Sequence, residues 1–200
     1  RSYASILDRL SKKAVRLQIP IGNEDAFEGV VELMKMKAYR FEGAMGEKVV
    51  EGEIPENLLE DAKKFRGELI EKIVENDEAL MNAYLEGTEP SMEDLKKTLR
   101  KAVINNAIFP VYTGTALRNK GVQLVLDAVV DYLPSPVDLK PIKGIDPKTG
   151  DEIERKASDD EPFCALAFKL QADPFVGQLT FFRVYSGKIE AGSYIYNSTT

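Results

Sequence analysis

The 200-residue chain contains no histidine and only one cysteine, Cys164. The lack of histidine removes the commonest general base and zinc ligand, and with them every Ser-His-Asp or Cys-His catalytic arrangement. A single thiol can form neither an internal disulfide nor a thiolate metal cluster, and its scarcity suggests a reducing compartment. Because Cys164 lies in an apolar strand pattern, core packing is favoured over reactivity.

Charge and hydrophobicity exclude further classes of protein. The net charge of −6 and the pI of about 5.0 disfavour a direct nucleic-acid groove, which needs clustered Lys and Arg. No apolar run approaches the roughly 18 residues of a membrane span. No signal-peptide pattern opens the chain. We therefore expect a soluble, cytoplasmic protein with no membrane association.

The common ligand-binding motifs are also missing. The chain has no G-x-x-x-x-G-K-[ST] phosphate loop, no G-x-G-x-x-G and no acidic calcium loop. The short stretch Gly43–Gly46 precedes no helix at the required place, so a solvated turn is favoured over a phosphate contact. The acidic pairs at Asp151-Glu152 and Asp159–Glu161 fit solvated linker charges better than paired catalytic groups.

Hydrophobic periodicity predicts a mixed α/β protein. We expect an N-terminal amphipathic helix over residues 3–14, a strand ending at Pro20 and a small hairpin within Gly29–Tyr39. Residues 43–52 are predicted to form a turn. Three helices should follow, one opened by Pro55, one over Glu78–Leu85, and one started by a capping box at Ser91.

The second half of the chain begins with a predicted buried strand at Ile108–Thr113 and a helix at Val122–Tyr132. Its polar stretch, residues 143–161, indicates a linker or a long surface hairpin. Three strands should then open an all-β, barrel-like unit that is too short to close. Those strands are Phe163–Leu170, Leu179–Tyr185 and Tyr194–Asn197. The apolar face of the preceding helix is expected to comprise Val122, Val125, Leu126, Val129 and Leu133.

The segment with the clearest binding potential is the loop Gly114–Gly121, between the predicted strand and helix. Open α/β sheets bind ligands at the carboxyl ends of their strands. Small residues here would let the backbone approach a ligand, and Thr115 offers a hydroxyl. Taken alone, this pattern is explained better by an ordinary tight turn.

Longer matches make the chain resemble the translational GTPases, most closely bacterial elongation factor G. The loop and the following helix, which ends in Asp-Tyr-Leu-Pro-Ser-Pro, are similar to the guanine-recognition loop and closing helix of that family. The peptide-release GTPase and the ribosomal protection proteins are rivals within the superfamily, but the long insertion favours elongation factor G. The matching runs are Gln18–Gly22, Met36–Tyr39, Tyr84–Gly87, Phe109–Leu117, Asn119–Gln123, Leu126–Pro136, Lys143–Pro147, Ala157–Phe163 and Asp173–Gly187.

The resemblance implies a fold and its division into domains. The fold would be α/β, the C-terminal part of a P-loop GTPase domain with an inserted α+β subdomain, followed by the first strands of an antiparallel β-barrel. The GTPase part would comprise residues 1–17 and 108–136. Residues 18–107 would form the insertion, 137–161 a linker, and 162–200 the truncated second domain.

The resemblance also implies roles for single residues. Thr115, Ala116 and Leu117 correspond to the Ser-Ala-Leu loop that closes over the guanine base. The Ala116 N–H would donate to the O6 carbonyl, and Leu117 would pack against the ring. Thr115 replaces the usual Ser and keeps its hydroxyl, although its extra methyl alters the local surroundings.

Glu71, Glu75 and Glu78 match acidic positions of the inserted segment, which in the family contacts a basic domain of the ribosomal stalk protein. Their i, i+4, i+7 spacing would put them on one helix face, if Asn76-Asp77 does not break the helix. An ordinary solvated acidic face is the alternative.

The same resemblance sets expectations for activity. The parent protein would be a GTPase that uses GTP and Mg²⁺ to drive tRNA and mRNA movement on the ribosome. The phosphate loop, the switch regions and the Asn-Lys-x-Asp motif are absent, so we expect the isolated chain to be an inactive, non-catalytic module that binds no GTP. An unpaired strand edge invites pairing between copies, which predicts a dimer through that edge.

Overall fold

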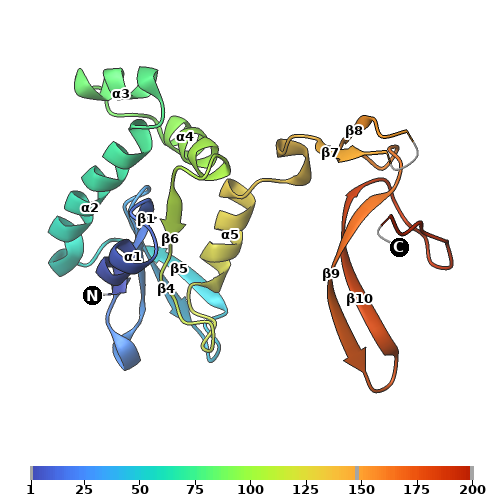
Figure 1. Cartoon of the computed structure of the whole chain (residues 1–200). Coiled ribbons are helices and arrows are strands. Elements are labelled where there is room, and N and C mark those ends of the chain that lie inside the picture. The colour runs from blue at the N-terminus through green and yellow to red at the C-terminus, as the bar shows by residue number, and fades with distance from the viewer. Residues whose placement is uncertain (1, 147–148, 199–200) are drawn as a thin grey trace. The chain divides into compact units, whose positions relative to one another are not determined.

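The computed structural model describes residues 2–146 and 149–198. The chain divides into two compact units, Arg1–Leu133 and Pro134–Thr200 (Figure 1). Some predicted positions lie outside the described residues. They are residues 1 and 200, which bound the predicted domains, and Pro147 of the predicted linker. Within those residues no helix has the length and apolar character needed to cross a bilayer.

A parallel pair of short strands stands at the centre of the first unit. The predicted N-terminal helix is confirmed as α1 (Ser2–Arg9) but is shorter than the expected residues 3–14, because Ala14 already belongs to β1 (Ala14–Arg16), which pairs with β6 (Phe109–Val111). The predicted strand here is confirmed but shorter, and its burial is partly wrong. Ile108 is buried, whereas Phe109 is 40% exposed, because β6 has one strand neighbour in the part of the chain described.

The second sheet of this unit is antiparallel and has four strands in chain order: β2 (Gln18–Ile21), β3 (Gly29–Glu32), β4 (Lys37–Glu42) and β5 (Lys48–Gly52). The predicted hairpin is confirmed as β3 and β4. The strand expected to end at Pro20 continues to Ile21, since β2 is an edge strand, where proline is tolerated. The turn predicted for residues 43–52 is wrong in its second half, which forms β5.

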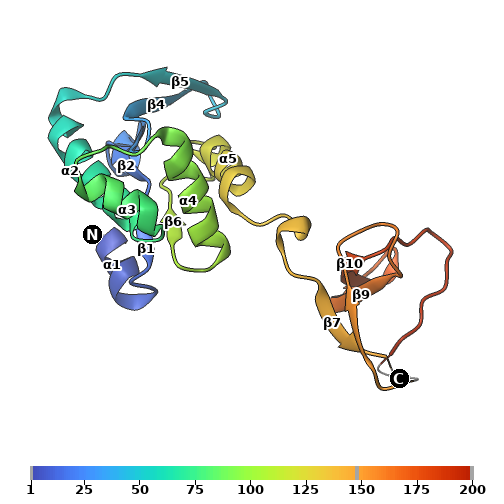
Figure 2. The same ribbon diagram turned by 90° about the horizontal axis from the view of Figure 1, so that it is seen from above.

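The helices lie where periodicity predicts them. They are α2 (Glu56–Val74), α3 (Glu78–Leu85), α4 (Met92–Ile104) and α5 (Val122–Tyr132), and α2, α3 and α4 lie together in both views (Figures 1 and 2). Only the N-cap half of the predicted capping box is confirmed: the Ser91 hydroxyl accepts from Asp94 N at 3.1 Å, while the Asp94 carboxylate accepts from that hydroxyl at 2.6 Å instead of from the Ser91 backbone N–H.

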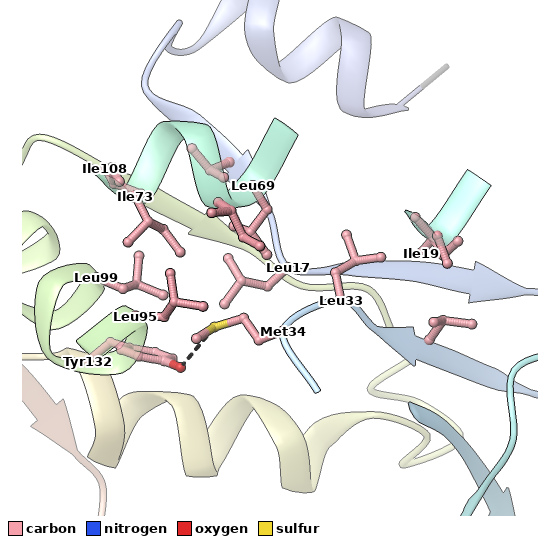
Figure 3. Packing of buried hydrophobic residues seen from close by; sticks show 14 of the residues in the cluster. Leu17, Ile19, Leu33, Met34, Leu69, Ile73, Leu95, Leu99, Ile108 and Tyr132 are labelled. Atoms are coloured by element: carbon pink, nitrogen blue, oxygen red, sulfur yellow. Dashed lines mark hydrogen bonds between the residues drawn. The ribbon is translucent and has the colours of Figure 1, made fainter. Parts of the chain in front are cut away.

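Leu17 joins the two sheets. Its N–H donates to Val111 O of β6 at 3.0 Å, and its C=O accepts from Leu33 N at 2.9 Å, just beyond β3. Its side chain is fully buried, and Figure 3 shows it between Leu69 of α2 and Met34. The remaining labelled members of this core in Figure 3 are Ile19, Leu33, Ile73, Leu95, Leu99, Ile108 and Tyr132.

The apolar face predicted for α5 is wrong. Leu126 is 60% exposed and Val129 is 45% exposed. The helix packs through Leu124, Ala128 and Tyr132 instead, which are spaced four residues apart. Most of this helix is apolar, so two neighbouring stripes satisfy helical periodicity, and the stripe that carries the tyrosine ring reaches the core.

The second unit is built from hairpins. A short 3-10 helix at Pro136–Asp138 precedes the antiparallel pair β7 (Ile142–Ile145) and β8 (Glu152–Arg155), which confirms the surface-hairpin alternative for the linker. The long hairpin of β9 (Cys164–Asp173) and β10 (Gly177–Ser186) follows. The mixed α/β class with a C-terminal β hairpin is thus confirmed, whereas assignment of the first unit to a GTPase domain stays a prediction.

The third strand predicted for the second unit, Tyr194–Asn197, is wrong. This segment is irregular, and the Tyr194 side chain is 100% exposed. In the part of the chain described here, no neighbouring strand supplies the ladder hydrogen bonds that would hold it extended. Cys164, expected in a core, is half-buried at the start of β9.

The position of Leu17 yields a stability prediction. Leu17→Ala should lower the free energy of unfolding by about 2–5 kcal/mol, because it leaves a cavity where the two sheets and α2 meet. Urea denaturation monitored by circular dichroism measures this loss. Leu10→Ala is the control: Leu10 is 78% exposed, so the change should stay within about 0.5 kcal/mol. Equal losses of unfolding free energy in the two variants would contradict the conclusion that Leu17 joins the two sheets.

Candidate functional site

The candidate site is the loop between β6 and α5, and its backbone closes on itself. Thr115 N donates to Lys120 O at 2.9 Å, and Lys120 N donates back to Thr115 O at 3.1 Å. Inside this bridge, Asn119 N donates to Ala116 O at 3.0 Å and forms a tight turn. Main-chain hydrogen bonds therefore define the loop.

Two glycines bring the ends of the loop together. A Cβ on Gly114 would lie 2.7 Å from Lys120 O, and a Cβ on Gly121 would lie 2.9 Å from Thr113 O. Gly121 also has a φ of +90°, a left-handed conformation that side chains disfavour, and it precedes the first turn of α5. Both positions need glycine because the two backbone segments touch.

The three residues implied in guanine contact lie together at the outer end of this loop. Thr115 is half-buried, Ala116 is exposed, and the Leu117 side chain is 89% exposed. Within the described chain the Ala116 N–H donates to no protein acceptor, and is free to meet a carbonyl. The loop follows the carboxyl end of β6 in a parallel pair, the usual place for a ligand in such sheets.

Gln18, at the start of β2, holds the first residue of the loop. Its side chain is 3% exposed, and its Oε1 accepts a hydrogen bond of 3.2 Å from Thr113 N. Gln18 Nε2 and Thr113 Oγ1 are buried with no hydrogen-bond partner in the described structure. Both residues line an open groove of about 1260 Å³, bounded also by α1 and the start of α2.

The far end of the loop is held by residues that follow β2. Lys120 Nζ donates to Phe27 O at 3.1 Å, just after the short 3-10 helix Glu24–Ala26. Arg118 also pairs with Asp25 at 3.2 Å, but both side chains are more than half exposed, so this ion pair contributes little to holding the loop.

Gly46 lies against the same end of the loop. A Cβ placed there would meet Arg118 O at 3.0 Å and Asn119 O at 3.1 Å. The turn Gly43–Gly46, expected to be solvated, thus buries its last residue. Sequence reasoning missed all of these supports, because each joins segments far apart in the chain.

The acidic residues of the insertion do not share one helix. α2 ends at Val74, because Asn76 Nδ2 donates to Lys72 O at 2.8 Å, and Asp77 caps α3 by accepting from Leu80 N at 3.2 Å. The alignment of Glu71, Glu75 and Glu78 on a single helix face is therefore wrong. All three are exposed, Glu71 and Glu75 at the end of α2 and Glu78 at the start of α3, and Glu75 pairs with Lys72 at 2.9 Å.

Ionisable groups in the first unit are structural in character. Burial raises the pKa of the Glu32 carboxyl, although the N–H groups of Met34 and Lys35 donate to it and oppose the rise. Burial likewise raises the pKa of Tyr112 and Tyr132, so both phenols stay protonated. No cluster of three or more His, Cys, Asp or Glu fit to hold a metal occurs among residues 2–146 and 149–198.

Comparison with known proteins identifies the relationship. Residues 162–200, which include β9 and β10, match the family model of elongation factor G domain 2. A crystal structure of a protein from Thermus thermophilus is similar over 96% of this chain, with 30% identity and a TM-score of 0.72. The chain is related to elongation factor G. It spans 26% of the length of the Thermus protein.

The β9–β10 hairpin lies within the segment that matches elongation factor G domain 2. Apolar side chains such as Phe168 and Leu170 are 66% and 65% exposed in this unit. The same segment belongs to the second-domain family, which supports the prediction of a barrel-like unit begun by these strands. A two-stranded hairpin leaves both faces open unless other strands or a helix cover them.

The glycine contact at the base of the loop gives a matched test. Gly121→Ala should destabilise the protein by more than Gly87→Ala, because both residues have φ near +90° but only Gly121 has backbone within 4 Å of the added methyl. The left-handed conformation alone costs about 1 kcal/mol in both variants. Thermal unfolding of the two proteins isolates the additional clash. Equal shifts in Tm would show that the backbone at Thr113 and Gly121 can move apart to accept the added methyl without cost.

Proposed function

We propose that the protein acts as a translational GTPase of the elongation factor G type, a cytoplasmic translocase that moves tRNA and mRNA on the ribosome. In this proposal the loop Thr115–Leu117 contacts the guanine of GTP or GDP. The Ala116 N–H carries the proposal, because in the described chain it donates to no protein acceptor and belongs to an exposed residue on a loop closed by main-chain hydrogen bonds. A donor at this point favours the O6 carbonyl of guanine over the amino group of adenine.

This chain supplies only one side of such a nucleotide site. It contains no phosphate-loop sequence, and the residues described offer no carboxylate cluster suited to Mg²⁺. We therefore assign neither phosphate nor metal contacts to these residues. The isolated chain should not bind or hydrolyse GTP, whereas the full-length protein should do both.

The guanine contact can be tested by changing the ligand rather than the protein. Full-length protein should bind GDP at least about tenfold more tightly than the 5′-diphosphate of 2-aminopurine riboside, which lacks the O6 acceptor and leaves the amide unpaired. Calorimetric titration measures both affinities. Equal affinities would exclude O6 recognition, and micromolar binding of labelled GTP to the isolated chain would contradict a site that needs other segments.

A second proposed function is non-catalytic and concerns the inserted segment. Glu71, Glu75 and Glu78 are exposed at the junction of α2 and α3, and a basic domain of the ribosomal stalk protein would complement them.

Charge reversal tests the stalk interaction. Glu71→Lys combined with Glu75→Lys should weaken binding of the stalk domain about tenfold or more, because like charges would then face each other. Glu56→Lys with Glu60→Lys is the matched control, since it makes the same charge change at the start of the same helix. Fluorescence anisotropy at low salt measures both. Identical affinities of the two double variants would favour an ordinary solvated face.

A further inference from the structure

The loop at Thr113–Gly121 is supported by a continuous stretch of another part of the fold. We call this stretch, residues 18–27, the anchor strip; it comprises β2, the short 3-10 helix and Phe27. Gln18 at its start bonds the first residue of the loop, and Phe27 at its end accepts from Lys120. The strip therefore holds both ends of the loop.

The Gln18 contact is partly buried and joins residues far apart in the chain. Its Oε1 accepts from the Thr113 N–H, and its side chain is 3% exposed. Without this acceptor, the partly buried Thr113 N–H would lose its protein partner, at a cost that grows with its exclusion from water. Gln18 thus fixes the point at which the chain leaves β6.

The Lys120 contact acts directly on the residues implied in recognition. The Lys120 ammonium is held by Phe27 O, while the Lys120 main chain exchanges two hydrogen bonds with Thr115. Any displacement of Lys120 is therefore passed to Thr115 and to the adjoining Ala116 N–H. Gly46 restricts the same end of the loop through its close approach to Arg118 O and Asn119 O.

We propose that Gln18 and Lys120 are positioning residues that aim the Ala116 N–H at its ligand, so that the anchor strip sets the selectivity of the loop. This inference rests on the proposed function, because the ligand is taken to be guanine. Neither residue touches the base. Both act through the backbone of the loop.

The first experiment measures the loop without any ligand, in the chain itself. Gln18→Met removes the acceptor, and Lys120→Met removes the ammonium while it keeps the aliphatic stem. Amide hydrogen exchange followed by NMR should accelerate about tenfold at Thr113 in the first variant and at Thr115 in the second. Arg118→Met is the matched control; its ion pair with Asp25 is largely exposed, and its loss should leave both rates unchanged.

The second experiment measures selectivity in the full-length protein. Lys120→Met should reduce the preference for GDP over 2-aminopurine riboside diphosphate about tenfold, Lys120→Arg should restore it, and Arg118→Met should not change it. A loss of overall stability alone would weaken both ligands equally and leave this ratio intact. Lys120→Met also keeps the inference testable if Gln18→Met fails to fold.

The outcomes separate the two proposals. Faster exchange together with a lost preference supports the positioning role. Unchanged exchange at Thr115 in Lys120→Met overturns it, as does faster exchange with a full preference for GDP. If the unmodified protein shows no preference for GDP, the proposed function fails, and the exchange rates alone decide whether the anchor strip holds the loop.

Discussion

The backbone of Leu17 is the constraint on which the first unit depends. One residue donates to the parallel pair and accepts from the antiparallel sheet, so the chain changes sheets without an intervening loop. The next residue, Gln18, is consequently buried with its side chain directed to the end of β6. A strand break in this place brings the base of the candidate loop and the start of the four-stranded sheet together. The helices α2 and α4 then close the core over the same point.

Local sequence signals predicted the elements better than their surroundings. The Ser91 N-cap, the bounds of α3 and the hairpin of β3 and β4 follow from residues close in sequence, and all are confirmed. Two of the wrong predictions concern burial and partners: the exposed face of α5 and the irregular Tyr194–Asn197 depend on what packs beside them. Hydrophobic periodicity indicates which face of a segment could be buried. It does not indicate whether another part of the fold covers that face.

The same distinction applies to the candidate site. The loop residues Thr115, Ala116 and Leu117 could be named from a resemblance, because their motif is contiguous. The supports of the loop could not, since Gln18, Phe27 and Gly46 reach it from other strands and turns. Gln18 even has the pattern of the polar, outward member of an alternating strand, yet it is almost completely buried. In the sequence, an amide between two apolar strand residues is the only local hint. Once the structure shows that the amide is buried, a hydrogen-bond partner from elsewhere in the chain is expected.

The closure of the loop by main-chain hydrogen bonds has an evolutionary consequence. The Thr115–Lys120 hydrogen bonds, the turn closed by Asn119 and the close contacts of Gly114 and Gly121 fix the shape of the loop. The side chains of residues 116–118 take no part in this, since they are exposed or form an exposed ion pair. Those three positions can therefore accept new residues while the fold is maintained, and sequence drift there alters what the loop touches rather than whether it forms. The framework of the loop thus depends on its main chain and on the segments that support it, whereas the exposed residues 116–118 determine what it contacts.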